Sequence, residues 1–207
     1  MGDIGCPPKC PPKSRLRVLD VFAGSGCCGI AILKHIKNSH CDFLDIDNSC
    51  LKQIRLNLKL NKIAKNRYRI IKSNIFSAFS VLPTANYKLL INNYQLILAN
   101  PPYIPTAKKT NLPKSVLDFE QKAALLARDN GLFYIKRFLQ EAKKFLAKDG
   151  VIYLEFDSPQ KNKIAMLLKK YGYQHFKFQK DQFHKWRLAI INHKSSPLVL
   201  LEKIPII

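Results

Sequence analysis

The 207-residue sequence predicts an α/β fold built on a mostly parallel sheet. Short apolar runs of strand length alternate with segments of helical periodicity. A glycine-containing turn joins the first of these strands to the first helix. Near the middle of the chain, Asn100-Pro101-Pro102-Tyr103 ends an uncharged strand, because proline cannot donate to a sheet ladder. A chain of this length suits one domain with a core of its own.

The composition is strongly basic. Lys and Arg number 35 against 14 Asp and Glu, a formal net charge of +21. Such a charge favours a polyanionic partner, with RNA or a ribonucleoprotein first, although an AT-rich genome would also enrich lysine. No apolar run reaches the roughly 18 residues of a membrane span, and the N-terminus lacks the core of a signal peptide. We therefore expect a cytoplasmic protein with no membrane association.

The six cysteines are expected to be reduced. Cys6 and Cys10 are separated by three residues, and no second pair of ligands at matching spacing accompanies them, so we expect no metal site. The other four are expected to pack as small apolar side chains on or beside helices and strands: Cys27, Cys28, Cys41 and Cys50.

The first third of the chain has the layout of a nucleotide-type binding loop. Residues 1–14, rich in proline, predict a disordered or extended leader. A strand over 16–22 carries Asp20 near its end and runs into a turn at 23–29, followed by an apolar helix over 30–36. Gly24 and Gly26 in the turn allow positive φ and a close approach of a ligand to the backbone.

Two acidic residues compete for one role after the second strand, which is expected over 41–44. Asp45 lies about 20 residues past the glycines, where an acceptor for two ribose hydroxyls is expected, and we favour it over Asp47. The helix that follows should expose its lysines and its arginine. It should bury three apolar residues, Leu51, Ile54 and Leu58.

The third strand is expected over 68–71 and leads to Asn74. The side-chain oxygen of Asn74 is placed to receive an adenine amino group. The alternative for this residue is ordinary capping of a polar turn.

The tetrapeptide after the strand at 94–99 carries the chemistry. In open α/β sheets, ligands bind at the carboxyl ends of the strands. The Asn100 side chain and the Pro101 carbonyl supply two adjacent acceptors, which suit the two hydrogens of a planar NH2 group. The Tyr103 ring can lie over the flat face of that group. The alternative is a proline-rich turn that merely closes a core strand.

Long connections at 77–93 and 104–130 are expected to form functional lids or walls. A helix should begin at Gly131 and end before a turn at 148–150, with core positions Ile135, Phe138, Leu139, Ala142 and Leu146. A strand over 151–156 and a helix over 159–170 follow, the helix burying Ile164, Leu167 and Leu168. The last strands, 174–178 and 187–191, leave no room for a helix between them and should be antiparallel. Residues 194–207 form a tail that either adds an edge strand or hangs loose.

Taken in order, these motifs resemble the class I S-adenosylmethionine-dependent methyltransferases. The closest resemblance is to the catalytic domain of the release factor glutamine methyltransferases, over residues 16–192. Later matches in the same family order are Ile104, Phe119-Glu120, Ala124-Leu125 and Asp129-Asn130-Gly131-Leu132. The resemblance implies a Rossmann-like three-layer sandwich over residues 15–193, with a mostly parallel seven-stranded sheet and an antiparallel last strand.

The resemblance also implies roles for individual residues. The residues expected to bind S-adenosylmethionine are Asp20, Phe22, Gly24, Gly26, Asp45, Asn74, Ile75 and Asn100. The residues expected to bind the substrate are Asn100, Pro101, Pro102, Tyr103 and Glu120, of which Asn100, Pro101 and Tyr103 would be catalytic. Phe22 stands where the family has its first glycine, Asn74 replaces the usual Asp, and a leader stands where the family has a helical docking domain.

The expected function is methyl transfer to the side-chain amide nitrogen of a protein glutamine, in the Gly-Gly-Gln motif of a peptide chain release factor. The rival is an N6-adenine methyltransferase acting on RNA or DNA, because the adenine amine is also a planar NH2 group. Another methyltransferase, or a binding module without turnover, remains a further alternative. The basic surface predicts ribosome or RNA contact, and the oligomeric state is not readable from the sequence.

Overall fold

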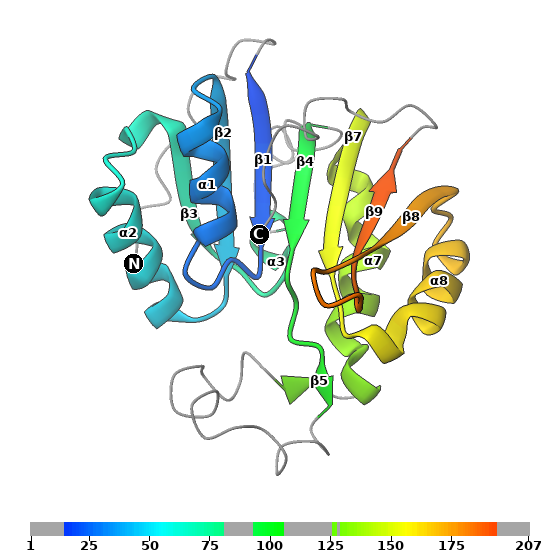
Figure 1. Ribbon diagram of the computed structural model, residues 1–207. Helices are drawn as coiled ribbons and strands as arrows, with labels where there is room; N and C mark the ends of the chain where they lie inside the picture. Colours follow the sequence, from blue (N-terminus) through cyan, green and yellow to red (C-terminus); the bar gives the residue numbers. More distant parts are fainter. Residues whose placement is uncertain (1–14, 81–92, 106–125, 128, 194–207) are drawn as a thin grey trace.

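The computed structural model describes residues 15–80, 93–105, 126–127 and 129–193. Its main sheet has seven strands in the order β3-β2-β1-β4-β7-β9-β8 (Figure 1). These strands are β1 (Leu16–Val21), β2 (Ser39–Asp45), β3 (Tyr68–Lys72), β4 (Tyr94–Ala99), β7 (Leu146–Glu155), β8 (His175–Lys180) and β9 (Trp186–Asn192). The pairs from β3 to β7 are parallel, and β9 runs antiparallel to both β7 and β8. The predicted sheet, with its antiparallel last strand, is confirmed; the leader and the tail lie outside the described residues.

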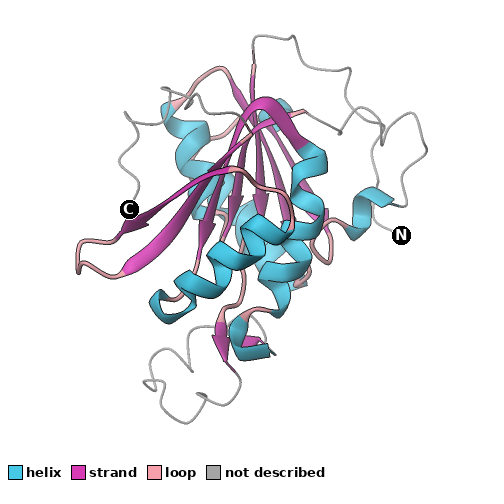
Figure 2. Ribbon diagram, turned by 90° about the vertical axis from the view of Figure 1, so that its right-hand side faces the viewer, coloured by secondary structure: helices cyan, strands magenta, loops and turns pink. Residues whose placement is uncertain are grey.

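Helices cover both faces of the sheet (Figures 1 and 2). One face carries α1 (Cys27–His35) and α2 (Asn48–Leu60), and the other carries α3 (Ser77–Ser80), α7 (Phe133–Phe145) and α8 (Lys161–Lys170). Alternation along β1 produces the two cores, because successive strand side chains point to opposite faces. Val18 packs with α1 and α2, whereas Leu19 and Val21 pack with α7. This is the three-layer sandwich that the sequence predicts.

The helix periodicities identify the buried faces correctly. The predicted inward residues of α2 and α8 are all buried, as are the first four predicted core residues of α7. The sequence places the end of α7 wrongly. Leu146 has extended backbone angles and begins β7, and residues 148–150 belong to that strand rather than to a turn before it. The β4–β7 register shifts from Tyr94↔Leu146 to Leu96↔Val151, so β7 holds the extra residues as a bulge.

The cysteine prediction is right for one residue and wrong for two. Cys41 is buried in β2, and Cys50 is half-buried on α2. Cys27 and Cys28 are exposed, because α1 begins at Cys27, inside the predicted turn, and its first turn faces solvent.

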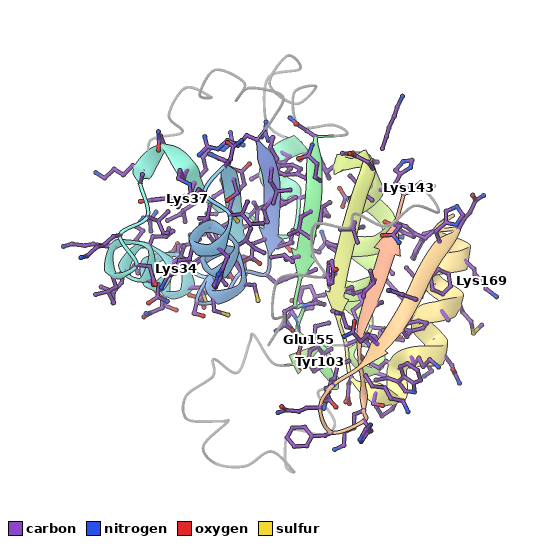
Figure 3. The ribbon with its side chains drawn as sticks, turned by 45° about the horizontal axis from the view of Figure 1, so that its top comes forward. Lys34, Lys37, Tyr103, Lys143, Glu155 and Lys169 are labelled. Carbon is purple, nitrogen blue, oxygen red and sulfur yellow. The ribbon has the colours of Figure 1, made fainter. Side chains whose placement is uncertain are left out.

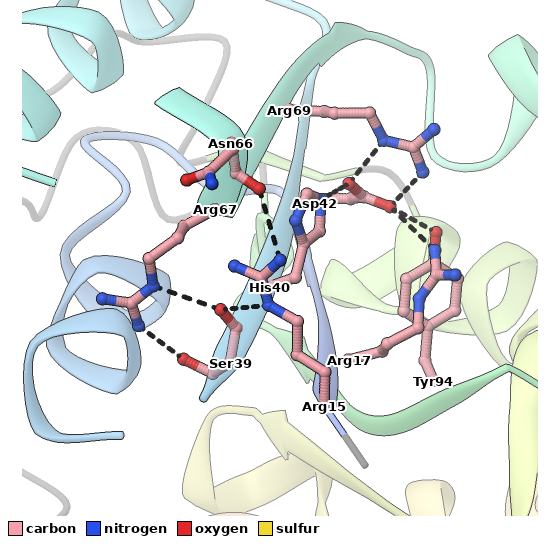
Figure 4. Close-up of polar contacts among 9 residues, drawn as sticks. All are labelled: Arg15, Arg17, Ser39, His40, Asp42, Asn66, Arg67, Arg69 and Tyr94. Carbon is pink, nitrogen blue, oxygen red and sulfur yellow. Dashed lines mark hydrogen bonds and ion pairs between the residues drawn. The ribbon is translucent and has the colours of Figure 1, made fainter. Parts of the chain in front are cut away.

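The buried carboxylate of Asp42 on β2 contacts side chains of three other strands, Arg17 of β1, Arg69 of β3 and Tyr94 of β4 (Figure 4). Asp42 of β2 accepts hydrogen bonds from Arg69 Nε at 2.7 Å and from the Tyr94 hydroxyl at 2.6 Å, and its Oδ1 lies 3.1 Å from His40 Nε2. Burial alone would raise the pKa of Asp42, but the hydrogen bonds from Arg69 and His40 outweigh it and hold that pKa well below its usual range. The charge is therefore compensated inside the protein.

None of the helices in the described part of the chain has the length and apolarity that a membrane span requires.

Candidate active site at the carboxyl edge of the sheet

The parallel register brings three predicted site residues to one edge. Val21 of β1 lies opposite Leu44 of β2 and Ala99 of β4. The next residue on each strand is therefore at the same level: Phe22, Asp45 and Asn100. The sequence alone could not supply this alignment, because it depends on the order β2-β1-β4.

The turn after β1 keeps a glycine-like backbone at a position that lacks glycine. Phe22 has φ +60°, in the left-handed region that side chains adopt at a cost of about 1–3 kcal/mol. Its ring packs against Tyr134 and Phe138 of α7, with centroids 6.0 and 6.4 Å apart. Packing onto α7 thus supports a backbone conformation at Phe22 for which the sequence resemblance implied glycine.

The space beside Gly24 is open. Gly24 has φ +55°, and a Cβ built there would meet no atom within 4 Å. Gly26, by contrast, has φ +76° and lies against Ile54 and Phe43, so it lets α1 approach α2 and β2 closely. Of these two glycines, Gly24 is the one with room for a ligand beside its backbone.

The Asp45 carboxylate joins the end of β2 to the glycine turn. Its Oδ2 accepts from the Gly24 N–H at 2.8 Å, and its Oδ1 accepts from the Asp47 N–H at 2.9 Å. Asp47 has another task, because its Oδ1 accepts from the N–H and hydroxyl of Ser49 and caps α2. This arrangement favours Asp45 as the ribose acceptor.

Asp20 lies underneath the turn. Its Oδ2 accepts from the Gly29 N–H at 2.9 Å, and a Cβ at Gly29 would come within 2.4 Å of the Phe43 ring. Sequence reasoning missed the need for glycine at this position. Burial raises the pKa of Asp20 to about 8, partly opposed by the Gly29 hydrogen bond. An uncharged carboxyl held in this way would ionise if a cationic group were placed beside it.

Two exposed thiols lie at the start of α1, within the same turn. The sulfurs of Cys27 and Cys28 are 3.9 Å apart. A hydrogen bond from Cys28, and to a smaller extent one from Ser25, lowers the pKa of Cys27 to about 6 against the effect of burial, while the pKa of Cys28 is raised. A pKa lowered in this way makes Cys27 the more nucleophilic of the two thiols near neutral pH, which adjacency in the sequence alone does not establish.

The segment after β3 presents a strained backbone where the adenine is expected. Ile75 has φ +59° and is buried, and its carbonyl accepts from the Ser73 hydroxyl at 2.7 Å. The Asn74 N–H donates to Ser77 Oγ at 3.1 Å, so the backbone of this residue starts α3. Within the described residues the Asn74 side chain makes no hydrogen bond. The capping alternative thus applies to the Asn74 backbone, and the side chain remains available as an acceptor.

The tetrapeptide turns away from the sheet and is tied to β7. Pro101 is buried, Asn100 is exposed and Tyr103 is half-buried. The Tyr103 hydroxyl donates to Glu155 Oε1 at 3.1 Å, at the carboxyl end of β7 (Figure 3). Burial, together with the charge of Glu155, raises the pKa of Tyr103 above its usual range, so its hydroxyl stays protonated. Sequence reasoning missed Glu155, although a polar residue that ends a predicted strand at this edge is a recognisable signal.

Gln160 holds the loop after β4 in place through hydrogen bonds to its backbone. Its Nε2 donates to the carbonyls of Tyr103 and Asn130, both at 3.0 Å, and its Oε1 accepts from the Asp157 N–H. Gly131, at φ +83°, lies so close that a Cβ there would be 1.9 Å from the Tyr103 carbonyl oxygen. The contacts of Asn130, Gly131 and Gln160 thus fix the position of the Tyr103 backbone. Gln160 could not have been found from the sequence, because its partners are 57 and 30 residues away.

Glu120, predicted to contact the substrate, lies outside the described residues. Across the ranges that the structure does describe, His, Cys, Asp and Glu side chains form no group of three suited to a metal ion. Chemically, the edge offers an exposed amide, a proline-fixed carbonyl, a tethered phenol and a glycine turn with two carboxyl groups.

Comparison with known proteins shows which family shares these features. A family model described as the methyltransferase small domain matches residues 9–135. A release factor glutamine methyltransferase of Flavobacterium psychrophilum is 27% identical over 86% of this chain and 59% of its own length. A ribosomal protein uL3 glutamine methyltransferase of Francisella tularensis is 32% identical over 69% of this chain and 42% of its own.

A solved structure shares the fold. The hMettl16 catalytic domain, in complex with the MAT2A 3′UTR hairpin 6, superposes with a TM-score of 0.65 at 16% identity over 89% of this chain and 66% of that chain. At that identity only the fold is comparable. The chain spans 59% and 61% of the lengths of two release factor glutamine methyltransferases that it matches.

Proposed function

This chain belongs to the methyltransferase small domain family, and from that premise we propose that it is an S-adenosylmethionine-dependent methyltransferase that acts on the side-chain amide nitrogen of a protein glutamine. The observation that carries the proposal is the placement of Asn100 at the carboxyl edge of β4. There it is level with the turn after β1, and the tetrapeptide beyond it is tethered to β7.

The residues at this edge fit the cofactor. The open backbone at Gly24 admits a ligand, and Asp45 stands beside it with a carboxylate of the kind that binds ribose hydroxyls. Asp20 offers a desolvated carboxyl group suited to a cationic group such as an amino acid ammonium. The bound cofactor would supply an electrophilic methyl group at a sulfonium. Asn74 and Ile75 would contact the adenine.

The chain's own residues would orient the substrate. Asn100 Oδ1 and the Pro101 carbonyl would accept the two N–H bonds of the glutamine amide, and the Tyr103 ring would lie against its plane. An amide nitrogen is a poor nucleophile because its lone pair is delocalised into the carbonyl. Holding both N–H bonds favours the geometry in which that lone pair points at the methyl carbon. Positioning of this kind is worth up to about 7–11 kcal/mol in well-aligned cases.

A strong general base is not required if the amide proton leaves after the methyl group has arrived. The Tyr103 hydroxyl is itself unsuited to be that base, since its raised pKa keeps it protonated. Its bond to Glu155 instead holds the ring in place.

We propose the glutamine of a Gly-Gly-Gln motif in a peptide chain release factor as the substrate. The name of the Flavobacterium relative supports a release factor, whereas the name of the Francisella relative points to a ribosomal protein as an alternative substrate. Methylation of adenine in RNA or DNA is the second candidate. The +21 charge favours it, and the same pair of acceptors would hold an adenine amine.

Radiolabelled cofactor tests the proposal directly. The protein is incubated in parallel with a release factor containing Gly-Gly-Gln, with the same factor carrying Gln→Ala in that motif, with ribosomal protein uL3 and with total RNA. Label on the first factor alone supports the proposal, and Asn100→Ala should abolish it while leaving cofactor affinity nearly intact. Label on RNA but on none of the proteins would overturn the glutamine reaction in favour of methylation of nucleic acid.

A further inference from the structure

The turn between β8 and β9 extends past the end of β7, next to the site. In the β7–β9 pairing, Glu155 lies opposite Leu188, and the Phe156 N–H donates to the Arg187 carbonyl. The residues before Arg187 therefore continue beyond the carboxyl edge, on the side where Glu155 holds Tyr103. Figure 1 shows this β8–β9 turn reaching the same end of the molecule as the segment after β4.

One carboxylate holds this turn rigid. Asp181 Oδ1 accepts from the N–H groups of Phe183 and Lys185, both at 2.9 Å, and the Asp181 N–H donates to the Lys185 carbonyl. Asp181 Oδ2 also pairs with Arg187 at 3.2 Å, and His184 adopts a positive φ. The turn is preorganised, so that binding a partner costs little conformational entropy there.

The fixed turn displays an apolar ring. Phe183 is 70% exposed, the most exposed aromatic side chain among the described residues. Four hydrogen bonds hold the backbone that carries this ring. The Asp181 carboxylate accepts from the N–H groups of Phe183 and Lys185, the Asp181 N–H donates to the Lys185 carbonyl, and the His184 N–H donates to the Asp181 carbonyl. The ring is therefore presented outward from a defined position. Aromatic side chains, Phe among them, are enriched at the cores of protein interfaces.

The surroundings of the ring are cationic. Residues 180–187 contain Lys180, Lys185 and Arg187 against a single acidic residue, Asp181. Arg187 neutralises that carboxylate and also pairs with Asp157 at 3.1 Å. Lys161 and Lys180 lie over the Trp186 ring, with Nζ 3.9 and 5.0 Å from its centroid, so the aromatic base of the turn is already covered by positive charge. A partner that fits here is acidic and offers an apolar pocket.

We propose that residues 180–186 dock an acidic segment of the protein substrate, with Phe183 as its apolar anchor. This inference rests on the proposed function, because the partner is the protein that carries the methylated glutamine. The surface lies outside the groups that hold the reacting amide. It therefore sets how tightly a whole protein binds, and leaves the chemical step to Asn100 and its neighbours.

The experiment compares a full-length release factor with a short peptide spanning its glutamine. Phe183→Ala and Lys185→Glu remove the ring and reverse the charge. Leu60→Ala and Lys59→Glu are the matched controls: Leu60 is 67% exposed at the end of α2, at the other edge of the sheet. For Phe183→Ala and for Lys185→Glu, we expect KM for the whole factor to rise roughly tenfold with kcat nearly unchanged. Peptide methylation, and both control variants, should stay at the wild-type level.

Other outcomes overturn the inference. An equal loss of methylation with the factor and with the peptide would mean that Phe183 acts in the chemistry or the folding of the site. Unchanged KM values would mean that residues 180–186 dock no substrate. If these variants bind single-stranded RNA more weakly but methylate the factor normally, residues 180–186 would be a nucleic-acid contact. If wild-type protein methylates neither substrate, the proposed function fails. The docking proposal is then tested separately by measuring the binding of the factor to the wild type and to Phe183→Ala. Weaker binding by Phe183→Ala supports docking at this surface, and equal binding rules it out.

Discussion

Tyr103 and Glu155 are joined by a hydrogen bond of 3.1 Å although 52 residues separate them in the sequence. The bond links the loop after β4 to the end of β7, so that two neighbouring strands share the positioning of one aromatic ring. It also fixes the proline-rich segment as one wall of the proposed substrate site.

The first prediction concerns this pair. Tyr103→Phe and Glu155→Gln should each lower the rate of methyl transfer roughly tenfold by loosening the ring, with cofactor affinity unchanged. The double variant should lose no more than either single one, because both remove the same contact. Single-turnover transfer measured beside cofactor titration checks this. Additive losses would show that the two residues act independently.

The pH dependence of transfer follows from the Tyr103 hydroxyl. Because its pKa is raised above the usual range, ionisation of this phenol should cause no loss of activity between pH 7 and 10. Rate profiles of the wild type and Tyr103→Phe should therefore run parallel over that range. A fall near the ordinary tyrosine pKa of about 10 that is absent from Tyr103→Phe would contradict the burial of the hydroxyl.

Gln160 offers a second test. Gln160→Leu leaves the carbonyls of Tyr103 and Asn130 without their donor, which should cost about 1–3 kcal/mol of unfolding free energy and slow methyl transfer. Gln179→Leu, on the exposed side of β8, is the control and should change neither. Urea unfolding and single-turnover rates provide the readouts. An unaltered rate in Gln160→Leu would mean that the loop keeps its position without this side chain.

Asp20 should make stability depend on pH. Its folded pKa of about 8 lies above the ordinary value of 3.8, so the folded state keeps a proton that the unfolded state releases. The contribution is complete below about pH 4 and is lost as the pH rises through 8, amounting to a few kcal/mol at most. Asp20→Asn should flatten the decline in unfolding free energy between pH 5 and pH 9. Equal slopes for the two proteins would exclude a buried, protonated Asp20.

Cys27 should react selectively with alkylating agents. With its pKa lowered to about 6, this thiol should take up iodoacetamide at pH 6.5, whereas Cys50, whose pKa burial raises to about 11, should not. Cys28→Ala removes the hydrogen bond and should slow the reaction at that pH. Peptide mass spectrometry identifies the modified residue, and bound cofactor should protect it if the turn is the binding site. Labelling at an equal rate with saturating cofactor would argue against that placement.

The buried Asp42 is expected to be essential for stability. Asp42→Asn leaves Arg69 without a buried counter-charge and should cost about 3–5 kcal/mol. Because the folded pKa of Asp42 is lowered, its contribution is present above about pH 4 and lost as the pH falls further. Asp149→Asn, an exposed position, serves as control. Equal thermal midpoints for the two variants would show that the cluster contributes nothing.

The fold was largely predictable because hydrophobic periodicity and the glycine and proline signals are local. The end of α7 was not, since no glycine or proline marks it and only pairing with β4 turns Leu146 into strand. The site divides in the same way. Asp20, Asp45 and Asn100 follow strands that meet at one edge and could be predicted to gather there. The contacts of Gln160 and the exposure of Cys27 depend on packing between distant segments, which no local pattern encodes.

The packing of Phe22 has a consequence for any redesign of the site. Its ring rests on α7, and α7 begins two residues after the Gly131 that abuts the Tyr103 carbonyl. The proposed cofactor side and the proposed substrate side of the site therefore both rest on α7. A change on one side should therefore disturb the other: glycine at position 22 would leave a cavity beside Tyr134, and a different helix in place of α7 would remove the packing partners of Phe22.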